Sequence, residues 1–334
     1  MVSPVAVGPL VAVHAHPDDE TLATGALLAT WAAAGAPATV VTCTRGERGE
    51  VIGSALAHLE GDGPALAAHR TGELAAALAR LGVRDHVFLD TVPGPAGQGP
   101  AGEPSAARYA DSGMAWAGVG QAGRLADLPP DAFVAAPLDE AAGRLARVLR
   151  DRRPSVVATY EPGGGYGHPD HVRAHEVAMA AVRLAADPAW EPEAGAPHTT
   201  PVVLWAAQGQ SALRQAYAAL AAEPAAPGQH SAEPALAVPD PDGPLPSVAV
   251  PDDEIDVVVD VAPVLPAVVG ALRAHATQVH ALGRVSPGAD PVVLGQYALS
   301  NDVLAPLLAV EGHRLAPGSR PEAVAWPTGV RKVA

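Results

Sequence analysis

Two short stretches combine histidines with carboxylates at spacings that suit a metal ion. AHPDDE, residues 15–20, follows the apolar run LVAV, and GYGHPDH, residues 165–171, follows the apolar run SVVATY. Three adjacent carboxylates in the first stretch repel one another, so we expect a cation among them. Histidine nitrogens and carboxylate oxygens are both common zinc ligands.

The spacing inside each stretch strengthens the metal hypothesis. His16 and Asp19 are three residues apart, as are His168 and His171, so each pair can share one face of a first helical turn. Two histidines and one carboxylate, with positions left open for water, are what a catalytic zinc requires. The alternative for the acids is a favourable charge at a helix N-terminus that opens with Pro17. The recurrence of H-P-D after a second apolar run favours the metal site.

Elements of alternating type must position these stretches. Apolar, β-branched runs predict strands at 10–14, 38–44, 86–90, 155–160, 201–207 and 255–261. Helical patterns lie between them, at about 17–34, 65–81, 138–152, 169–186 and from 262 through LRAHATQV to 279. This alternation predicts a doubly wound, mostly parallel, Rossmann-like α/β sheet with helices on both faces and a smaller C-terminal portion. Ligands bind such sheets at the carboxyl ends of the strands, where both stretches lie.

The chain divides into a core and a portion that completes it. We expect residues 8–210 to form the α/β core with the metal site, and residues 211–320 to complete the same catalytic domain. A Gly/Pro-rich loop at about 91–136 is too long for a mere connector. The Ala/Pro-rich segment at about 222–253 has no periodicity and is expected to be a mobile surface excursion.

Composition restricts the class of partner. The formal net charge of −15 argues against nucleic acid and against an anionic membrane surface, because no basic field is available to bind either. No apolar run is long enough for a bilayer, and the first residues lack a signal-peptide pattern, so we expect a cytoplasmic protein. The single cysteine, Cys43, excludes a disulfide framework, and its place in VVTCT predicts a buried structural thiol. No obligatory protein partner can be read from the sequence.

The two stretches together make the chain recognisable. AHPDDE with GYGHPDH resembles the LmbE-like, or PIG-L-like, family of zinc-dependent N-acetylglucosaminyl deacetylases. Longer stretches are similar to the branch of that family that serves actinobacterial mycothiol biosynthesis, namely VVTCTRGERGEVIG (40–53), RYADSGMA (108–115), YEPGGGYGHPDH (160–171) and LRAHATQV (272–279). That branch removes acetate from N-acetylglucosaminyl-inositol. The resemblance runs from about residue 10 to about 315, with little matched in 222–253.

The resemblance implies a ligand set and a base. By resemblance, His16, Asp19 and His171 bind one Zn²⁺ per subunit, although Fe²⁺ suits two nitrogens and an oxygen equally well. Asp18 is then free to accept a proton from the zinc-bound water, whose pKa zinc lowers to about 7, and to pass it to the leaving amine.

Further roles follow from the same resemblance. His168 becomes an acid or electrostatic partner for the tetrahedral intermediate, and Asp170 orients it and keeps it protonated. Tyr166 donates its phenolic hydrogen to the substrate carbonyl oxygen. The substrate is a small pseudodisaccharide, whose hydroxyls need polar partners. The positions similar to the family's sugar contacts are Arg70, Asp111 and Glu50, whereas His58, His275 and His280 are expected to be surface or packing residues.

Several other functions remain open. A mycothiol S-conjugate amidase, or another N-acetylglucosaminide deacetylase, shares the same metal motif. A non-heme Fe(II) oxygenase also uses two histidines and a carboxylate, but usually as H-x-D on a strand of an all-β barrel. A non-catalytic sugar-binding protein needs no base, so the presence of Asp18 beside a full ligand set argues against it.

Overall fold

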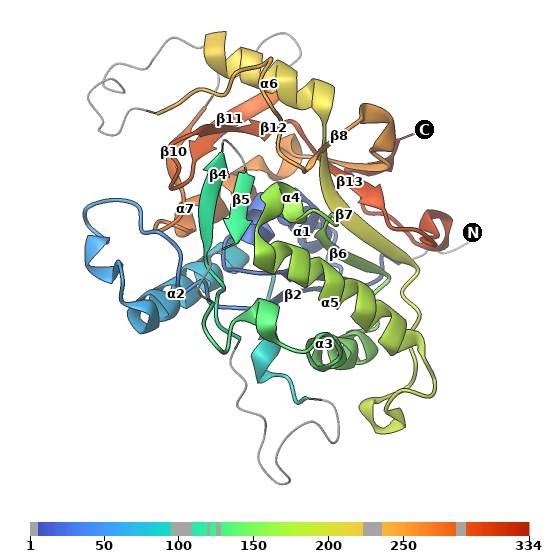
Figure 1. Ribbon diagram of the computed structural model, residues 1–334. Helices are drawn as coiled ribbons and strands as arrows, with labels where there is room; N and C mark the ends of the chain where they lie inside the picture. The colour runs from blue at the N-terminus through green and yellow to red at the C-terminus, as the bar shows by residue number, and fades with distance from the viewer. Residues whose placement is uncertain are drawn as a thin grey trace.

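A nine-stranded mixed sheet lies at the centre of the molecule (Figure 1). The computed structural model describes residues 6–94, 109–118, 121–124, 128–222, 236–284 and 292–333. The strands lie in the order β14 (Val330–Lys332), β9 (Val257–Asp260), β13 (Val310–Leu315), β7 (Val202–Gly209), β6 (Val156–Tyr160), β1 (Leu10–His14), β2 (Ala38–Thr42) and β3 (Asp85–Phe88). A short strand, β8 (Ala249–Val250), pairs with β7.

The predicted doubly wound, mostly parallel fold is confirmed, with an antiparallel extension. Strands β7, β6, β1, β2 and β3 run parallel to one another, with Leu10 of β1 opposite Ala38 of β2 and Val156 of β6. Strands β13, β9 and β14, from the C-terminal portion, continue the sheet beyond β7 in antiparallel pairs. The sequence pattern did not reveal this pairing, because the direction of a strand is set by contacts across the sheet.

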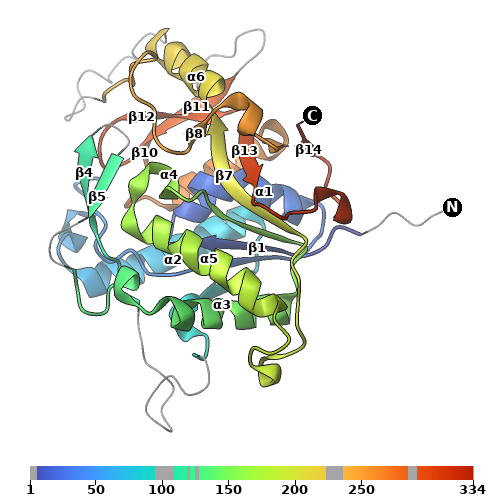
Figure 2. The same cartoon turned by 45° about the vertical axis from the view of Figure 1, so that its right-hand side comes forward.

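Helices cover both faces of the sheet (Figure 2). One hydrophobic core lies beneath α1 (Asp19–Ala33), α2 (Gly63–Leu81) and α7 (Leu265–Ala274), and the other beneath α3 (Leu138–Arg152) and α5 (Pro169–Ala186). Every residue of β1, β2 and β6 is buried, as expected for parallel strands that are covered on both sides.

The predicted helix boundaries agree with the structure at α3 and α5 and differ elsewhere. Helix α1 begins at Asp19 rather than at residue 17, because Pro17 and Asp18 form the preceding turn. Helix α7 ends at Ala274 rather than at residue 279, because His275 leaves helical geometry and buries its side chain in the interior. Cys43 is buried and free, as predicted.

The C-terminal portion contains elements that the sequence pattern did not predict. Helix α6 (Gln210–Ala222) packs on a three-stranded antiparallel sheet of β10 (His280–Gly283), β11 (Val293–Ala298) and β12 (Leu304–Leu308). The alanines of α6 merge in sequence with the Ala/Pro-rich segment that follows, which hides the helix. Of that segment, residues 223–235 lie outside the described residues, whereas 236–253 include β8 and the start of a 3-10 turn at Asp252–Glu254.

The long loop after β3 places polar residues beside the carboxyl edge of the sheet, next to Asp170 and His16. Residues 95–108 of this loop lie outside the described part, and β4 (Met114–Gly118) pairs with β5 (Gln121–Arg124) as a hairpin. Before the hairpin, Asp111 and Ser112 are buried. None of the helices in the described part of the chain combines the length and apolar character that crossing a bilayer requires.

Candidate metal centre and active site

The two histidine clusters meet at one edge of the sheet. Strands β1 and β6 are adjacent and parallel, so the residues that follow their carboxyl ends lie side by side. The ring of His16, after β1, lies 4.6 Å from the ring of His168 and 5.3 Å from that of His171, measured between centroids. His168 and His171 come from the loop after β6 and the first turn of α5. The convergence predicted from the sequence is therefore present.

Asp19 lies between two of these histidines. One carboxylate oxygen, Oδ2, is 3.2 Å from Nδ1 of His16, and the other, Oδ1, is 3.2 Å from Nε2 of His171. Four ligands around a zinc ion at its usual bond lengths lie roughly 3.3 Å apart, so these separations suit neighbouring ligands of one ion. The backbone N–H of His16 also donates to Oδ2 of Asp19, which fixes the carboxylate in this position.

The surroundings of His171 leave one of its nitrogens available. Its Nδ1 lies 3.1 Å from the carbonyl oxygen of Gly164, an acceptor, so Nδ1 carries the hydrogen and Nε2 carries the lone pair. That Nε2 is buried and has no hydrogen-bond partner among the described residues, although Oδ1 of Asp19 lies 3.2 Å away. The ring is held by stacking on Tyr160, whose centroid is 4.2 Å away. A buried lone pair without a donor fits a metal ligand.

Asp170 supports His16, which differs from its expected role beside His168. Its Oδ2 lies 3.2 Å from Nε2 of His16 and accepts the backbone N–H of Ser112 at 2.9 Å. Only the backbone of Asp170 contacts His168, through an N–H that donates to Nδ1. A carboxylate that accepts a hydrogen bond from one ring nitrogen of a histidine fixes the ring, so that the other nitrogen can face a metal. Here Asp170 binds Nε2, and Nδ1 is the nitrogen left on the side of Asp19. Asp170 lies in the first turn of α5, and from there its carboxylate contacts His16.

The charges around His16 favour a cation. Burial disfavours the protonated imidazole, but Asp111, Asp170 and Asp19 outweigh burial and hold the pKa of His16 well above its usual value. The ligand atoms of His16, His168 and His171 lie within 4.8 Å of one another, and so do those of His16, Asp111 and Asp170. A field that attracts a proton to a buried imidazole also attracts a divalent ion. The residues present therefore fit a metal ion, and His16 belongs to both possible groups.

Asp18 faces the cavity instead of capping its helix. It is the N-cap residue of α1, yet its side chain makes no capping hydrogen bond within the described chain, and its backbone has φ 119°. A positive φ is strained for a residue with a Cβ and is often found at functional sites. Oδ1 of Asp18 lies 3.4 Å from Nη2 of Arg70. Burial raises the pKa of Asp18 to about 7, with Arg70 acting in the opposite direction.

A buried pair of side chains, Glu20 and His275, supports the turn at Asp18. Glu20 accepts the backbone N–H of Asp18 at 2.9 Å, and its other oxygen lies 2.8 Å from Nε2 of His275. Both side chains are fully buried. His275 was predicted to be a surface or packing residue, and Glu20 had no predicted role. The position of His275 directly after an apolar helix was the available signal. Of the other two histidines, His58 is exposed and His280 contacts Asp302.

Replacing Glu20 should disturb catalysis without removing the metal. Glu20→Ala deletes the acceptor for the Asp18 N–H, so the strained turn relaxes and we expect kcat to fall about 10- to 100-fold, a usual effect of groups that orient site residues. Glu20→Gln keeps an oxygen for that N–H and should recover most of the loss. Steady-state kinetics and metal content decide the matter. Wild-type kcat in Glu20→Ala would show that the pair has no positioning role.

His168 and Tyr166 lie beside the same cluster as hydrogen-bond donors. Because Nδ1 of His168 accepts the N–H of Asp170, the neutral ring carries its hydrogen on Nε2. Burial, together with the nearby His16 and His171, lowers the pKa of His168 well below its usual value, so the expected protonated state is not supported. Burial and neighbouring carboxylates, of which Asp19 acts most strongly, raise the pKa of Tyr166 well above its usual value. Both side chains are therefore neutral and can each donate a hydrogen bond.

A polar cavity of about 100 Å³ opens onto these residues. It is lined by His16, Asp18, Tyr166 and His168 and by the three predicted sugar contacts, Arg70, Asp111 and Glu50. Asp111 is buried and lies 3.6 Å from His16, and Glu50 is exposed at the rim.

Arg70 has a second task at the wall of this cavity. It donates to the carbonyl oxygens of Gly46 and Pro17, tying the loop after β2 to the turn before α1. A Cβ at Gly46 would lie 2.1 Å from Nη1 of Arg70, so the close approach requires glycine there.

Comparisons with known proteins identify relatives of this chain. The chain is 46% identical over 307 residues to a 1D-myo-inositol 2-acetamido-2-deoxy-alpha-D-glucopyranoside deacetylase of Kineococcus radiotolerans, covering 92% of this chain and 76% of that protein. A protein of the same name from Streptomyces avermitilis is 44% identical, covering 93% of this chain and 92% of that protein. A solved N,N'-diacetylchitobiose deacetylase from Pyrococcus horikoshii aligns with a TM-score of 0.43 and 20% identity, over 60% of each chain, too weakly to carry an argument.

A family model described as GlcNAc-PI de-N-acetylase matches residues 11–182. This range begins in β1 and ends in α5, so it includes both histidine clusters. With that match and relatives above 40% identity over most of its length, the chain belongs to the PIG-L family of GlcNAc-PI de-N-acetylases.

Proposed function

We propose that the protein is a metal-dependent deacetylase that hydrolyses the N-acetyl amide of 1D-myo-inositol 2-acetamido-2-deoxy-alpha-D-glucopyranoside. The products are acetate and glucosaminyl-inositol, as in the mycothiol-pathway branch that the sequence resembles. The observation that carries the proposal is the position of Asp18. Its carboxylate faces a polar cavity beside the convergent nitrogens and carboxylate of His16, Asp19 and His171. A site that only bound a sugar would have no need for a base there.

The metal set proposed here is His16, Asp19 and His171, with one Zn²⁺ per subunit. A bound zinc ion would polarise the amide carbonyl and lower the pKa of a coordinated water to about 7. Support comes from the unpartnered Nε2 of His171 and from the two 3.2 Å contacts of Asp19. Fe²⁺ accepts the same ligand types, so metal analysis of the protein purified without added metal is needed to name the ion.

The protein's own groups divide the remaining chemistry. Asp18 accepts the proton of the attacking water and later gives it to the leaving amine, a task suited to a carboxyl that a bound cation holds ionised. Tyr166 and His168, each with a hydrogen to donate, stabilise the negative charge that develops on the amide oxygen. Asp170 keeps His16 in orientation rather than activating His168.

The decisive assay is acetate release from the acetylated substrate. Activity should disappear with a chelator and return when zinc or ferrous iron is added back. The mycothiol S-conjugate amidase reaction is the second candidate, and the same preparation should be assayed with a cysteinyl conjugate. Absence of acetate release from the metal-loaded protein would contradict the proposed function.

Glu50 offers a clean test of the sugar side of the cavity. Its side chain is exposed at the rim, so Glu50→Ala should leave the fold and the metal content unchanged. If Glu50 accepts a hydrogen bond from a substrate hydroxyl, losing it should raise KM about 5- to 150-fold, equivalent to about 1–3 kcal/mol. Glu193→Ala, at an exposed acid in a 3-10 turn outside the cavity lining, is the control. Equal KM values for the two variants would remove Glu50 from the substrate contacts.

A further inference from the structure

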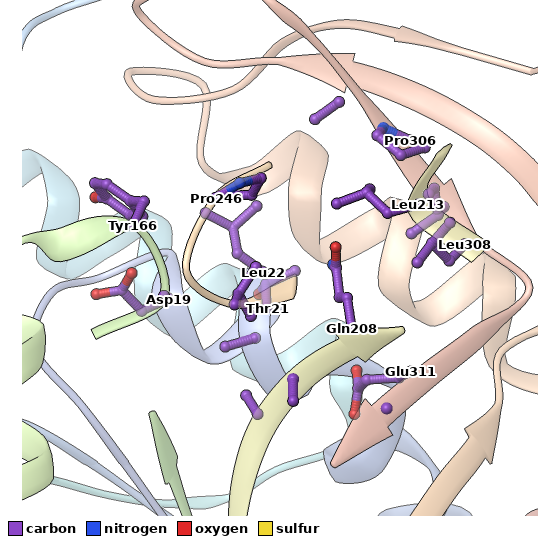
Figure 3. Close-up of a pocket in the computed structure, with 18 of the residues that line it drawn as sticks. Asp19, Thr21, Leu22, Tyr166, Gln208, Leu213, Pro246, Pro306, Leu308 and Glu311 are labelled. Carbon is purple, nitrogen blue, oxygen red and sulfur yellow. The ribbon is translucent and has the colours of Figure 1, made fainter. Parts of the chain in front are cut away.

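A second, larger cavity adjoins the metal centre on the side away from the sugar contacts. Its volume is about 270 Å³, and it shares four lining residues with the polar cavity, namely Asp19, Leu22, Tyr166 and Leu299. His171 also lines it, whereas Arg70, Asp111 and Glu50 line only the polar cavity. Figure 3 shows Asp19 and Tyr166 at one end of this cavity and Leu213 and Leu308 at the other, with Leu22 and Pro246 between them. The two cavities therefore meet at the reacting centre.

The lining of this second cavity is mainly apolar. Side chains come from α1, β7, α6 and β12, and include Leu22, Ala23, Ala207, Leu213 and Leu308. Two carboxylates line it, Asp19 at the metal centre and Glu311, which already accepts the backbone N–H groups of Ala26 and Leu27 at 2.8 and 3.0 Å. These two bonds cap α1 where the helix is interrupted at Thr24. Since this carboxylate is occupied, the cavity offers its contents mostly hydrocarbon contact.

The size of the cavity exceeds what an acetyl group needs. An apolar cavity of about 150 Å³ is enough to hold benzene, and this one is larger. A substrate whose sugar contacts Arg70, Asp111 and Glu50 and whose carbonyl carbon lies at the metal must direct its acyl group elsewhere. The second cavity also touches both Asp19 and Tyr166, so it is open to that group.

We propose that this cavity, named here the acyl chamber, binds the alkyl chain of N-acylglucosaminides whose acyl group is longer than acetyl. The proposal rests on the proposed function, which it extends to a wider class of amides. The reaction is unchanged in its balance. Water adds its oxygen to the carbonyl carbon, the C–N bond breaks, and the products are a carboxylate and the protonated amine of the sugar.

The first test compares chain lengths on one sugar. Initial rates of N-acetyl- and N-hexanoyl-glucosaminyl-inositol hydrolysis by the zinc-loaded protein give two values of kcat/KM. Each methylene buried in the chamber should raise kcat/KM by about fourfold, which corresponds to about 0.8 kcal/mol. Hexanoyl has four more methylenes than acetyl, so a hexanoyl-to-acetyl ratio of up to about 250 is expected if all four are buried. A ratio of one or less overturns the proposal and leaves the deacetylase function intact.

The second test narrows the chamber. Ala23 is half-buried on α1 and lines the chamber but not the polar cavity, so Ala23→Phe should lower the hexanoyl-to-acetyl ratio at least tenfold. Ala33→Phe adds the same side chain at an exposed position of the same helix and should keep the wild-type ratio. Val248→Phe, in another wall, is the second narrowing variant if Ala23→Phe fails to fold. A wild-type ratio in a folded narrowing variant overturns the proposal.

Binding measurements separate this proposal from the proposed function. In zinc-loaded Asp18→Asn, which should bind substrate and turn it over about 10²- to 10⁴-fold more slowly than the wild type, calorimetry should show tighter binding of the hexanoyl than of the acetyl substrate. If neither substrate is hydrolysed by the wild type, the proposed function fails, and the calorimetric comparison still decides the chamber. Equal affinities for the two substrates overturn the acyl chamber.

Discussion

Each of the single substitutions His16→Ala, Asp19→Ala and His171→Ala should remove the tightly bound metal and reduce activity to background. Asp19 contacts both histidines at 3.2 Å, so losing any one of the three breaks the proposed ligand set. The three side chains lie at the carboxyl edge of the sheet and outside both hydrophobic cores, so the fold should persist. Elemental analysis of the purified variants, with circular dichroism to check folding, gives the answer.

The matched control is His58→Ala, which removes an exposed histidine and should keep full metal and activity. Full stoichiometric metal in any of the three variants would exclude that residue as a ligand. In that case Asp111 and His168, which also lie near His16, become the residues to test next.

Asp18→Asn should retain the metal and bind substrate nearly normally, while kcat falls by about 10²- to 10⁴-fold, the usual contribution of a positioned base. Asparagine preserves the shape of the side chain and an oxygen toward Arg70, but it cannot accept the proton of the attacking water. Rapid-mixing or steady-state kinetics together with metal content test this. Loss of the metal, or wild-type kcat, would show that Asp18 is not the base.

The pH profile of the wild-type activity should also show the titration of Asp18 as the base. A base must be unprotonated to act, so activity rises as the pH increases through the pKa of Asp18, which burial raises to about 7 in the protein without an ion. A bound cation favours the carboxylate and moves this limb to lower pH. In Asp18→Asn the acidic limb should flatten or move.

The basic limb of that profile should report the pKa of a side chain that donates a hydrogen bond to the substrate. A donor must keep its hydrogen, so activity falls as the pH rises through its pKa. Tyr166, whose pKa burial raises, fits this limb better than His168, whose pKa burial lowers. In Asp18→Asn the basic limb should stay in place.

Much of the site could be predicted from the sequence because its information is local. His16 to Asp19 and His168 to His171 are each short segments that follow a buried apolar strand, and adjacent parallel strands bring such segments to the same edge. The strands and most helices on the two faces follow from hydrophobic periodicity, which depends on near neighbours along the chain. Fold class, the location of the site and its candidate ligands therefore came from the sequence.

Contacts between distant residues were decided only by the tertiary structure. Glu20 meets His275 across 255 residues, and Asp170 supports His16 across 154, and neither pairing has a local pattern that reveals it. The antiparallel strands β13, β9 and β14 and the acyl chamber depend likewise on how the C-terminal portion packs against β7 and α1. Local propensity determines which elements form, whereas burial in the assembled core determines which side chains meet.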